Sequence, residues 1–100
     1  MSINSDAADI LESAAFVIGT GHHAKGTFWD GYGWCALGAM GSANIELCGN
    51  DDAHAVALDA LQRVIGGGAT IAAWNDAPER TPEEVEAAML KAAAKLLGEA

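Results

Sequence analysis

Apolar and polar residues follow one another along most of this chain with the spacing of α-helices. Between Asp6 and Ile18 the apolar positions recur every three or four residues and comprise Ala7, Ile10, Leu11, Ala14, Val17 and Ile18. This spacing places them on one face of a helix. Ser5 or Asp6 can cap its start with a side-chain oxygen, and Gly19 can end it in a left-handed turn.

Two further helices are predicted in the middle of the chain. The first begins near Trp34 or Cys35 and stops at Gly49, and the residues toward one side are Leu37, Met40, Asn44 and Leu47. The second follows residues 50–52, Asn-Asp-Asp, which offer an N-cap and negative charge at the positive end of the helix dipole. Its apolar face comprises Ala53, Val56, Ala57, Ala60, Leu61 and Val64. Three glycines at 66–68 end it.

The clearest helix start lies near the C-terminus, in the sequence RTPEE. Thr81 is the predicted N-cap, Pro82 takes the first helical position and Glu84 completes a capping box. The buried stripe of this helix comprises Val85, Ala88, Met89, Ala92 and Leu96. The segment 69–75 before it is predicted as a brief helical turn that carries Ile71 and Trp74 to the core.

No stretch alternates with a period of two for long enough to predict a strand. The fold class is therefore all-α, a compact bundle of about four helices that forms a single domain over residues 1–100. A long loop, residues 20–33 with the sequence TGHHAKGTFWDGYG, separates the first two helices. It holds four glycines and three aromatic residues, and Phe28, Trp29 and Tyr32 are expected to pin it.

The charge balance disfavours nucleic acids and membranes as partners. Fourteen Asp and Glu residues face five Lys and Arg residues, for a formal net charge of −9. Binding to duplex DNA needs clustered cations, whereas here they are scattered: Lys25, Arg63, Arg80, Lys91 and Lys95. Anionic membranes would repel the chain for the same reason.

The expected compartment is the cytoplasm. Every apolar run is far shorter than the ~20 residues that cross a bilayer. The first ten residues, MSINSDAADI, lack the basic and apolar regions of a secretion signal. Two cysteines, Cys35 and Cys48, are too few for a disulfide scaffold and would stay reduced inside a cell.

Cys35 and the histidines are the candidates for chemistry. A thiol near a helix N-terminus can have a lowered pKa, and His22 or His23 could act as its base, but free cysteine is usually a core residue and that interpretation is favoured. Zinc could be held by members of the set His22, His23, Cys35, Cys48 and His54. Their spacing contains no C-x-x-C or H-x-x-x-H pair, so no metal site and no cofactor are predicted.

The run GWCALGAMGSA, residues 33–43, contains two glycines inside a predicted helix. Glycine there costs on the order of 1 kcal/mol relative to alanine, so Gly38 and Gly41 need a reason. Close approach of another backbone is the natural one. The neighbour is expected to be another helix of the same domain, with a second protomer of a homodimer as the alternative.

The stretch WNDAPERT, residues 74–81, is the second polar motif. Asn75 and Asp76 commonly shape turns through side-chain to backbone bonds, and Arg80 could bind the Asp76 carboxylate as a fork. A turn that aims the last helix is favoured over a ligand or partner site. The triple glycine lacks the lysine and the preceding strand of a phosphate loop, so nucleotide binding is rejected.

Together, WCALGA at 34–39 and WNDAPERTPEEV at 74–85 resemble a small uncharacterised domain family of actinobacteria and their phages, a domain of unknown function. The matching residues are Trp34, Cys35, Gly38, Ala39, Trp74, Asn75, Asp76, Arg80 and Thr81. Glu79 departs from the family pattern, which has glycine there, and residues 19–34 look peculiar to this chain. The resemblance implies a cytoplasmic phage or actinobacterial protein and carries no activity.

The leading hypothesis is a non-enzymatic protein that binds and modulates a host protein. An acidic surface and the aromatic residues Phe28, Trp29 and Tyr32 motivate it, because aromatic side chains are the usual anchors of interfaces. The alternatives are a Cys35-dependent thiol enzyme or zinc-binding protein, and an acidic DNA mimic. Fourteen acidic residues in a hundred are dilute for mimicry.

Overall fold

A computed structural model describes residues 2–47 and 49–98 of the chain. In chain order the elements are α1 (Ile3–Thr20), β1 (His22–His23), β2 (Gly33–Trp34), α2 (Ala36–Leu47), α3 (Asp51–Ile65), α4 (Ile71–Asp76) and α5 (Pro82–Gly98). The prediction of an all-α bundle with a long loop between the first two helices is confirmed. The helix beyond the four that were predicted is the short α4, which matches the helical turn expected at 69–75. Among the described residues, no helix has the length and apolarity needed to cross a membrane.

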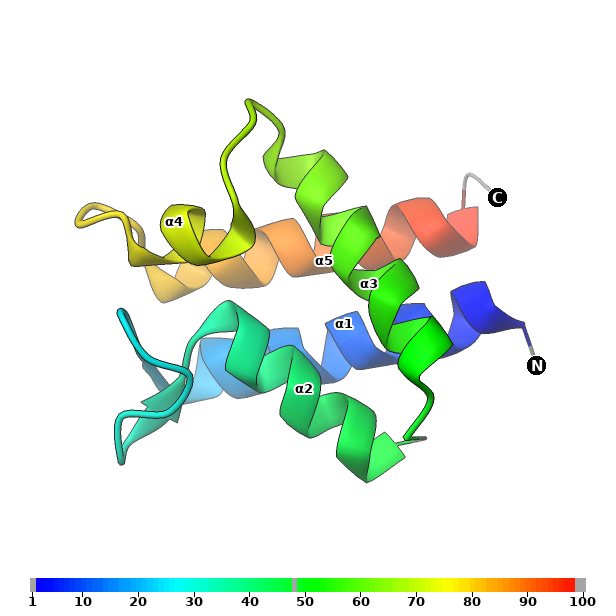
Figure 1. Ribbon diagram of the computed structural model, residues 1–100, viewed down its shortest axis with the longest axis horizontal. Coiled ribbons are helices and arrows are strands. Elements are labelled where there is room, and N and C mark those ends of the chain that lie inside the picture. The colour runs from blue at the N-terminus through cyan, green and yellow to red at the C-terminus, as the bar shows by residue number, and fades with distance from the viewer. Residues whose placement is uncertain (1, 48, 99–100) are drawn as a thin grey trace.

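The bundle is built on α1 and α5, which pack along each other, while α2 and α3 cover α1 (Figure 1). Alanines fill much of the core, so helices approach closely. The largest fully buried apolar side chains come from four helices and are Ile10, Leu11, Ile18, Met40, Leu61, Val85 and Met89. The loop between α1 and α2 and the C-terminal part of α5 lie at opposite ends of the molecule (Figure 1).

Two helix starts confirm the caps predicted from the sequence. The side chain of Asn50 accepts the N–H groups of Asp52 and Ala53. Thr81 and Glu84 form the predicted reciprocal box: the Thr81 N–H donates to Glu84 Oε1 at 2.9 Å, and the Glu84 N–H donates to Thr81 Oγ1 at 3.2 Å. These caps satisfy N–H groups that have no partner within the helix.

The first helix is longer than predicted at both ends. Its cap is Ser2, whose hydroxyl accepts the Ser5 N–H at 3.0 Å, and Gly21 ends it. Ser2, Ser5 and Asp6 can each cap a helix, and the predicted caps were the later two. Val17, placed on the buried face, is 38% exposed.

The apolar face of α2 also differs from the prediction. Its buried residues are Ala36, Ala39, Met40, Ala43 and Asn44. Leu47 is 52% exposed, and Leu37 is only partly buried. The helix turns its alanines and Met40 inward, because alanines allow close packing on α1, and this leaves Leu37 and Leu47 nearer the surface.

Candidate functional site

The segment between α1 and α2, residues 21–35, is called the aromatic loop here. Its strands β1 and β2 pair in parallel over two residues each. The Ala24 N–H donates to the Trp34 carbonyl at 3.1 Å, and the Cys35 N–H donates to the Phe28 carbonyl at 3.0 Å. The loop therefore has a defined backbone path, although it contains four glycines.

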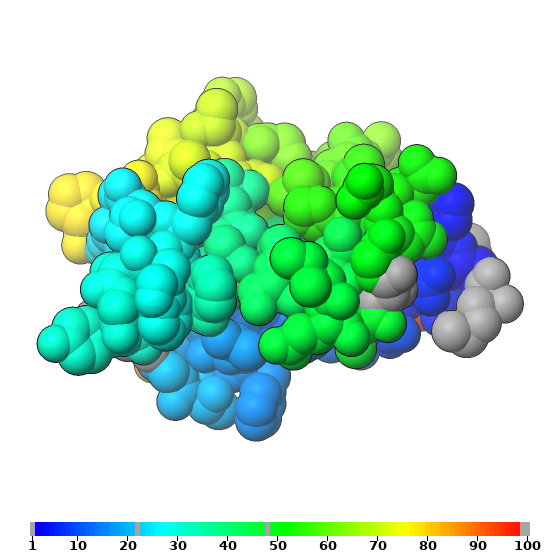
Figure 2. Space-filling model, turned by 60° about the horizontal axis from the view of Figure 1, so that its bottom comes forward, coloured from blue at the N-terminus to red at the C-terminus, as the bar shows by residue number. Residues whose placement is uncertain are grey.

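The three aromatic residues that were expected to pin this loop lie on its surface instead. Tyr32 is 83% exposed, Phe28 is 62% exposed and Trp29 is 48% exposed. Trp29 packs on the half-buried Trp34, with ring centroids 4.7 Å apart. In the space-filling view the loop (cyan) forms one end of the face shown, beside α2 (Figure 2). Most of the surface of the Phe28 and Tyr32 side chains is thus accessible to solvent.

A tight turn orients the tip of the aromatic loop. Asp30 Oδ1 accepts the N–H groups of Tyr32 and Gly33, each at 2.9 Å. Gly31, which follows Asp30, has a φ of 95°. Glycine adopts this left-handed conformation without the steric cost of a Cβ. The Asp-Gly pair is a turn signal in the sequence, although Asp30 was not singled out as a site residue.

Asn75 fastens the aromatic loop to the rest of the molecule. It lies in α4 and is 1% exposed. Its Oδ1 accepts the Ala36 N–H at 2.9 Å and contacts His23 Nε2 at 2.7 Å, while its Nδ2 donates to the Ala24 carbonyl at 3.0 Å. Because Oδ1 is the acceptor, His23 must carry its proton on Nε2. The motif asparagine therefore joins three segments far apart in the sequence.

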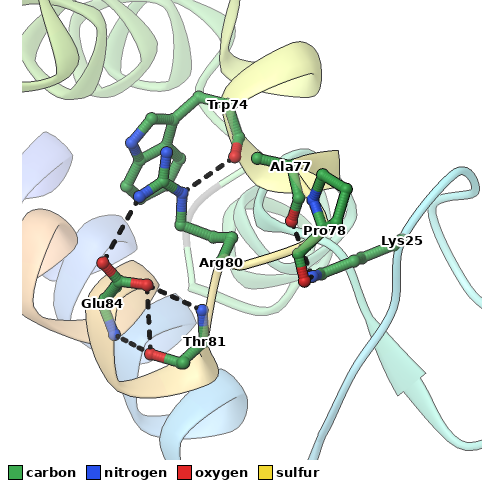
Figure 3. A network of polar contacts seen from close by, with 7 residues as sticks. All are labelled: Lys25, Trp74, Ala77, Pro78, Arg80, Thr81 and Glu84. Carbon is green, nitrogen blue, oxygen red and sulfur yellow. Dashed lines mark hydrogen bonds and ion pairs between the residues drawn. The ribbon is translucent and has the colours of Figure 1, made fainter.

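Asp76 extends this connection toward the tip of the loop. Its Oδ1 accepts the Gly26 N–H and the Asn75 side-chain amide, both at 2.9 Å. The hydrogen bond from Gly26 is the largest cause that holds the pKa of Asp76 below its ordinary value. From the loop side, Lys25 Nζ donates to the carbonyls of Ala77 and Pro78 at 2.7 and 3.1 Å (Figure 3).

The expected fork between Arg80 and Asp76 is wrong. Arg80 Nε donates to the Trp74 carbonyl at 2.9 Å, and its guanidinium lies over the Trp74 ring, 4.4 Å from the ring centroid. Its Nη1 lies 3.4 Å from Glu84 Oε2 (Figure 3). The chain leaves the helix after Asp76, so the two residues do not share a helical face, and Arg80 instead joins α4 to the start of α5.

The two glycines of α2 have different surroundings. A Cβ at Gly38 would lie 2.5 Å from the Phe28 carbonyl oxygen and 2.9 Å from Trp34 Cε3. The expected close backbone neighbour exists there, but it is the aromatic loop and not another helix. A Cβ at Gly41 would meet no described atom within 4 Å, so close packing does not explain that glycine.

Cys35 is a buried N-cap of α2. It is 7% exposed, its carbonyl accepts the Ala39 N–H at 2.9 Å, and the Gly38 N–H donates to its sulfur at 3.3 Å. The Nε2 atom of His23 contacts Asn75 Oδ1. The geometry thus gives Cys35 a capping role, and it places neither His23 nor His54 in hydrogen-bond contact with the thiol.

The candidate metal ligands do not converge in the described part of the chain. No group of three or more His, Cys, Asp or Glu side chains there could hold a metal ion. His54 lies on α3, and its Nε2 is buried without a hydrogen-bond partner among those residues. Cys48 lies outside the described residues.

Comparison with known proteins finds a match to one family model. The model, described as a family of unknown function (DUF6197), matches residues 3–95. No curated protein matches the chain. No solved structure matches it either.

Proposed function

The chain belongs to DUF6197, and we propose that it is a non-enzymatic protein that binds and modulates another protein through Phe28, Trp29 and Tyr32 of the aromatic loop. The single observation that carries the proposal is the exposure of these side chains, 48–83%, on a loop with a fixed backbone. Large aromatic side chains dominate binding free energy at interfaces. The proposed setting is the cytoplasm of an actinobacterium, with the chain encoded by the bacterium or by a phage.

The hydrogen bonds that hold the loop in place support this role. Asn75, Asp76 and Lys25 join the loop to α4, and Asp30 closes its tip. A surface that is already ordered loses less conformational entropy on binding than a flexible one. The WND motif would then serve recognition indirectly, because it holds the aromatic side chains in place.

The charge of the chain points to the character of the partner. A formal net charge of −9 favours and accelerates association with a basic surface. DNA mimicry would use the same charge, but Asn50 and Thr81 are followed by acidic residues that occupy the first turns of α3 and α5. Those carboxylates complement helix dipoles, so the aromatic loop is the better candidate surface.

Affinity capture from an actinobacterial lysate tests the proposal. Tyr32→Ala and Phe28→Ala are the test variants, because both side chains are mostly exposed and their loss should leave the fold intact. Leu97→Ala is the matched control, since Leu97 is 55% exposed and lies in the C-terminal part of α5, away from the loop. Trp29→Ala is less clean because Trp29 packs on Trp34.

The expected result is one protein retained by the wild type and by Leu97→Ala, and reduced about tenfold or more by the loop variants. Unfolding curves of all variants should coincide. Equal capture by the loop variants and the wild type would contradict the proposal.

A further inference from the structure

A pocket of about 360 Å³ opens between the aromatic loop and α4. Residues 26–28, Cys35, Leu37, Ala72 and Asp76 line it. Most of this lining is apolar, and among the described residues that form it Asp76 is the one charged side chain. A pocket with apolar walls and a single carboxylate suits a ligand that has an apolar stem and a positive end.

The carboxylate of Asp76 is available for such a ligand. Both of its hydrogen bonds, from Gly26 and Asn75, end on Oδ1. Oδ2 accepts no hydrogen bond from the described residues. The side chain is ionised at neutral pH, as aspartate ordinarily is, and the hydrogen bond from Gly26 lowers its pKa further.

Cations of the chain itself lie close to Asp76, and after the hydrogen bond from Gly26, His23 and Lys25 also contribute to its lowered pKa. Two of the chain's five Lys and Arg residues, Lys25 and Arg80, donate to backbone carbonyls at the C-terminal end of α4. Carbonyls at a helix C-terminus carry partial negative charge. The net charge of −9 adds to this field.

We propose that this pocket receives a basic side chain, arginine or lysine, from the protein that binds the aromatic loop. The inference rests on the proposed function and specifies the chemistry of the partner. The methylene stem lies against Leu37 and Ala72, and the charged head reaches Asp76. Phe28 lines the pocket and is 62% exposed, so its ring can cover the stem or face the cation.

Titration of the full chain with three small probes, followed by the NMR shifts of backbone amides, tests this proposal. The probes are the N-acetyl methylamides of arginine, lysine and norleucine, and norleucine provides the apolar stem without charge. The two basic probes should shift the amides of Leu37 and Ala72 saturably. Their affinity should exceed that of the norleucine probe about fivefold, as expected for a partly exposed ion pair.

Two variants separate the charge from the pocket. Asp76→Asn keeps an oxygen acceptor for Gly26 but removes the charge, and it should abolish the preference for basic probes. Ala72→Leu fills the pocket without altering Asp76, and it should weaken all three probes. Equal binding of basic and norleucine probes by the wild type, or an unchanged preference in Asp76→Asn, would overturn the proposal.

The proposal for this pocket and the proposed function can be refuted independently, because the titration contains no partner protein. If the wild type shows no preference for basic probes while capture still depends on Tyr32, only the proposal that the pocket receives a basic side chain is overturned. Capture that is indifferent to Tyr32 and Phe28 would overturn the proposed function whatever the probes do.

Discussion

Replacing Asn75 by alanine is expected to lower the free energy of unfolding by about 2–6 kcal/mol. The substitution leaves the Ala36 N–H and the Ala24 carbonyl without their partner, and both residues are fully buried. Each unsatisfied buried group costs about 1–3 kcal/mol. The total stability of a domain of this size is about 5–15 kcal/mol, so the loss is a large fraction.

The cost has an upper bound set by the aromatic loop itself. If the loop detaches from α4, water can solvate both groups, and the penalty becomes the free energy of opening the loop. We therefore expect a value toward the lower end of the range. Detachment should also expose the amides of Ala24 and Cys35, which donate to Trp34 and Phe28 in the closed loop.

Urea unfolding and amide hydrogen exchange together measure this effect. The urea midpoint of Asn75→Ala should fall while the slope stays constant, and the amides of Ala24 and Cys35 should exchange faster relative to those in α1. Glu79→Ala, an exposed change in the same segment, should stay within about 0.5 kcal/mol of the wild type. A loss below about 1 kcal/mol for Asn75→Ala, with unchanged exchange at both amides, would refute the role of Asn75 as the fastening residue.

Three further predictions use the same unfolding assay. Gly38→Ala should destabilise the fold by about 1–3 kcal/mol because the added Cβ meets the Phe28 carbonyl. Gly41→Ala should stabilise it by about 0.5–1 kcal/mol. Changes of the same sign in the free energy of unfolding would contradict the account of α2. Thr81→Ala should cost about 0.5–2 kcal/mol through loss of the α5 cap, and a neutral result would mean that the cap contributes nothing. The hydrogen bond from Gly26 holds the pKa of Asp76 in the folded chain below its ordinary value of 3.8. The ionised side chain therefore stabilises the fold fully above pH 3.8, and this contribution is lost as the pH falls through the folded pKa. The wild type should lose more stability than Asp76→Asn as the pH is lowered from about 6 to 3, and parallel losses would contradict this prediction.

The helices could be predicted from the sequence because their signals are local. The cap at Thr81, the glycines at 66–68 and the three- to four-residue apolar spacing each concern residues within a few turns of one another. The face of α2 was harder to predict, since alanine is compatible with either side of a helix. Only packing against α1 decides that Leu47 lies outside.

The contacts of the candidate site could not be predicted from local signals. Asn75 binds atoms that lie 39 and 51 residues away in the chain, and no periodicity encodes such partners. The fork between Asp76 and Arg80 was inferred from residues four apart in the chain, and that separation brings side chains together only within a continuous helix. Gly38 was correctly expected to touch another backbone, but the sequence could not identify it as the aromatic loop.

The most direct test of the central claim is photo-crosslinking in actinobacterial cells. A photoreactive phenylalanine analogue replaces Tyr32 in one variant and Leu97 in the other, since both side chains are exposed. The account predicts that Tyr32 crosslinks to one protein that the Leu97 position does not capture. Crosslinks to the same set of proteins from both positions, or none from Tyr32, would contradict the claim that the aromatic loop is a protein-binding surface.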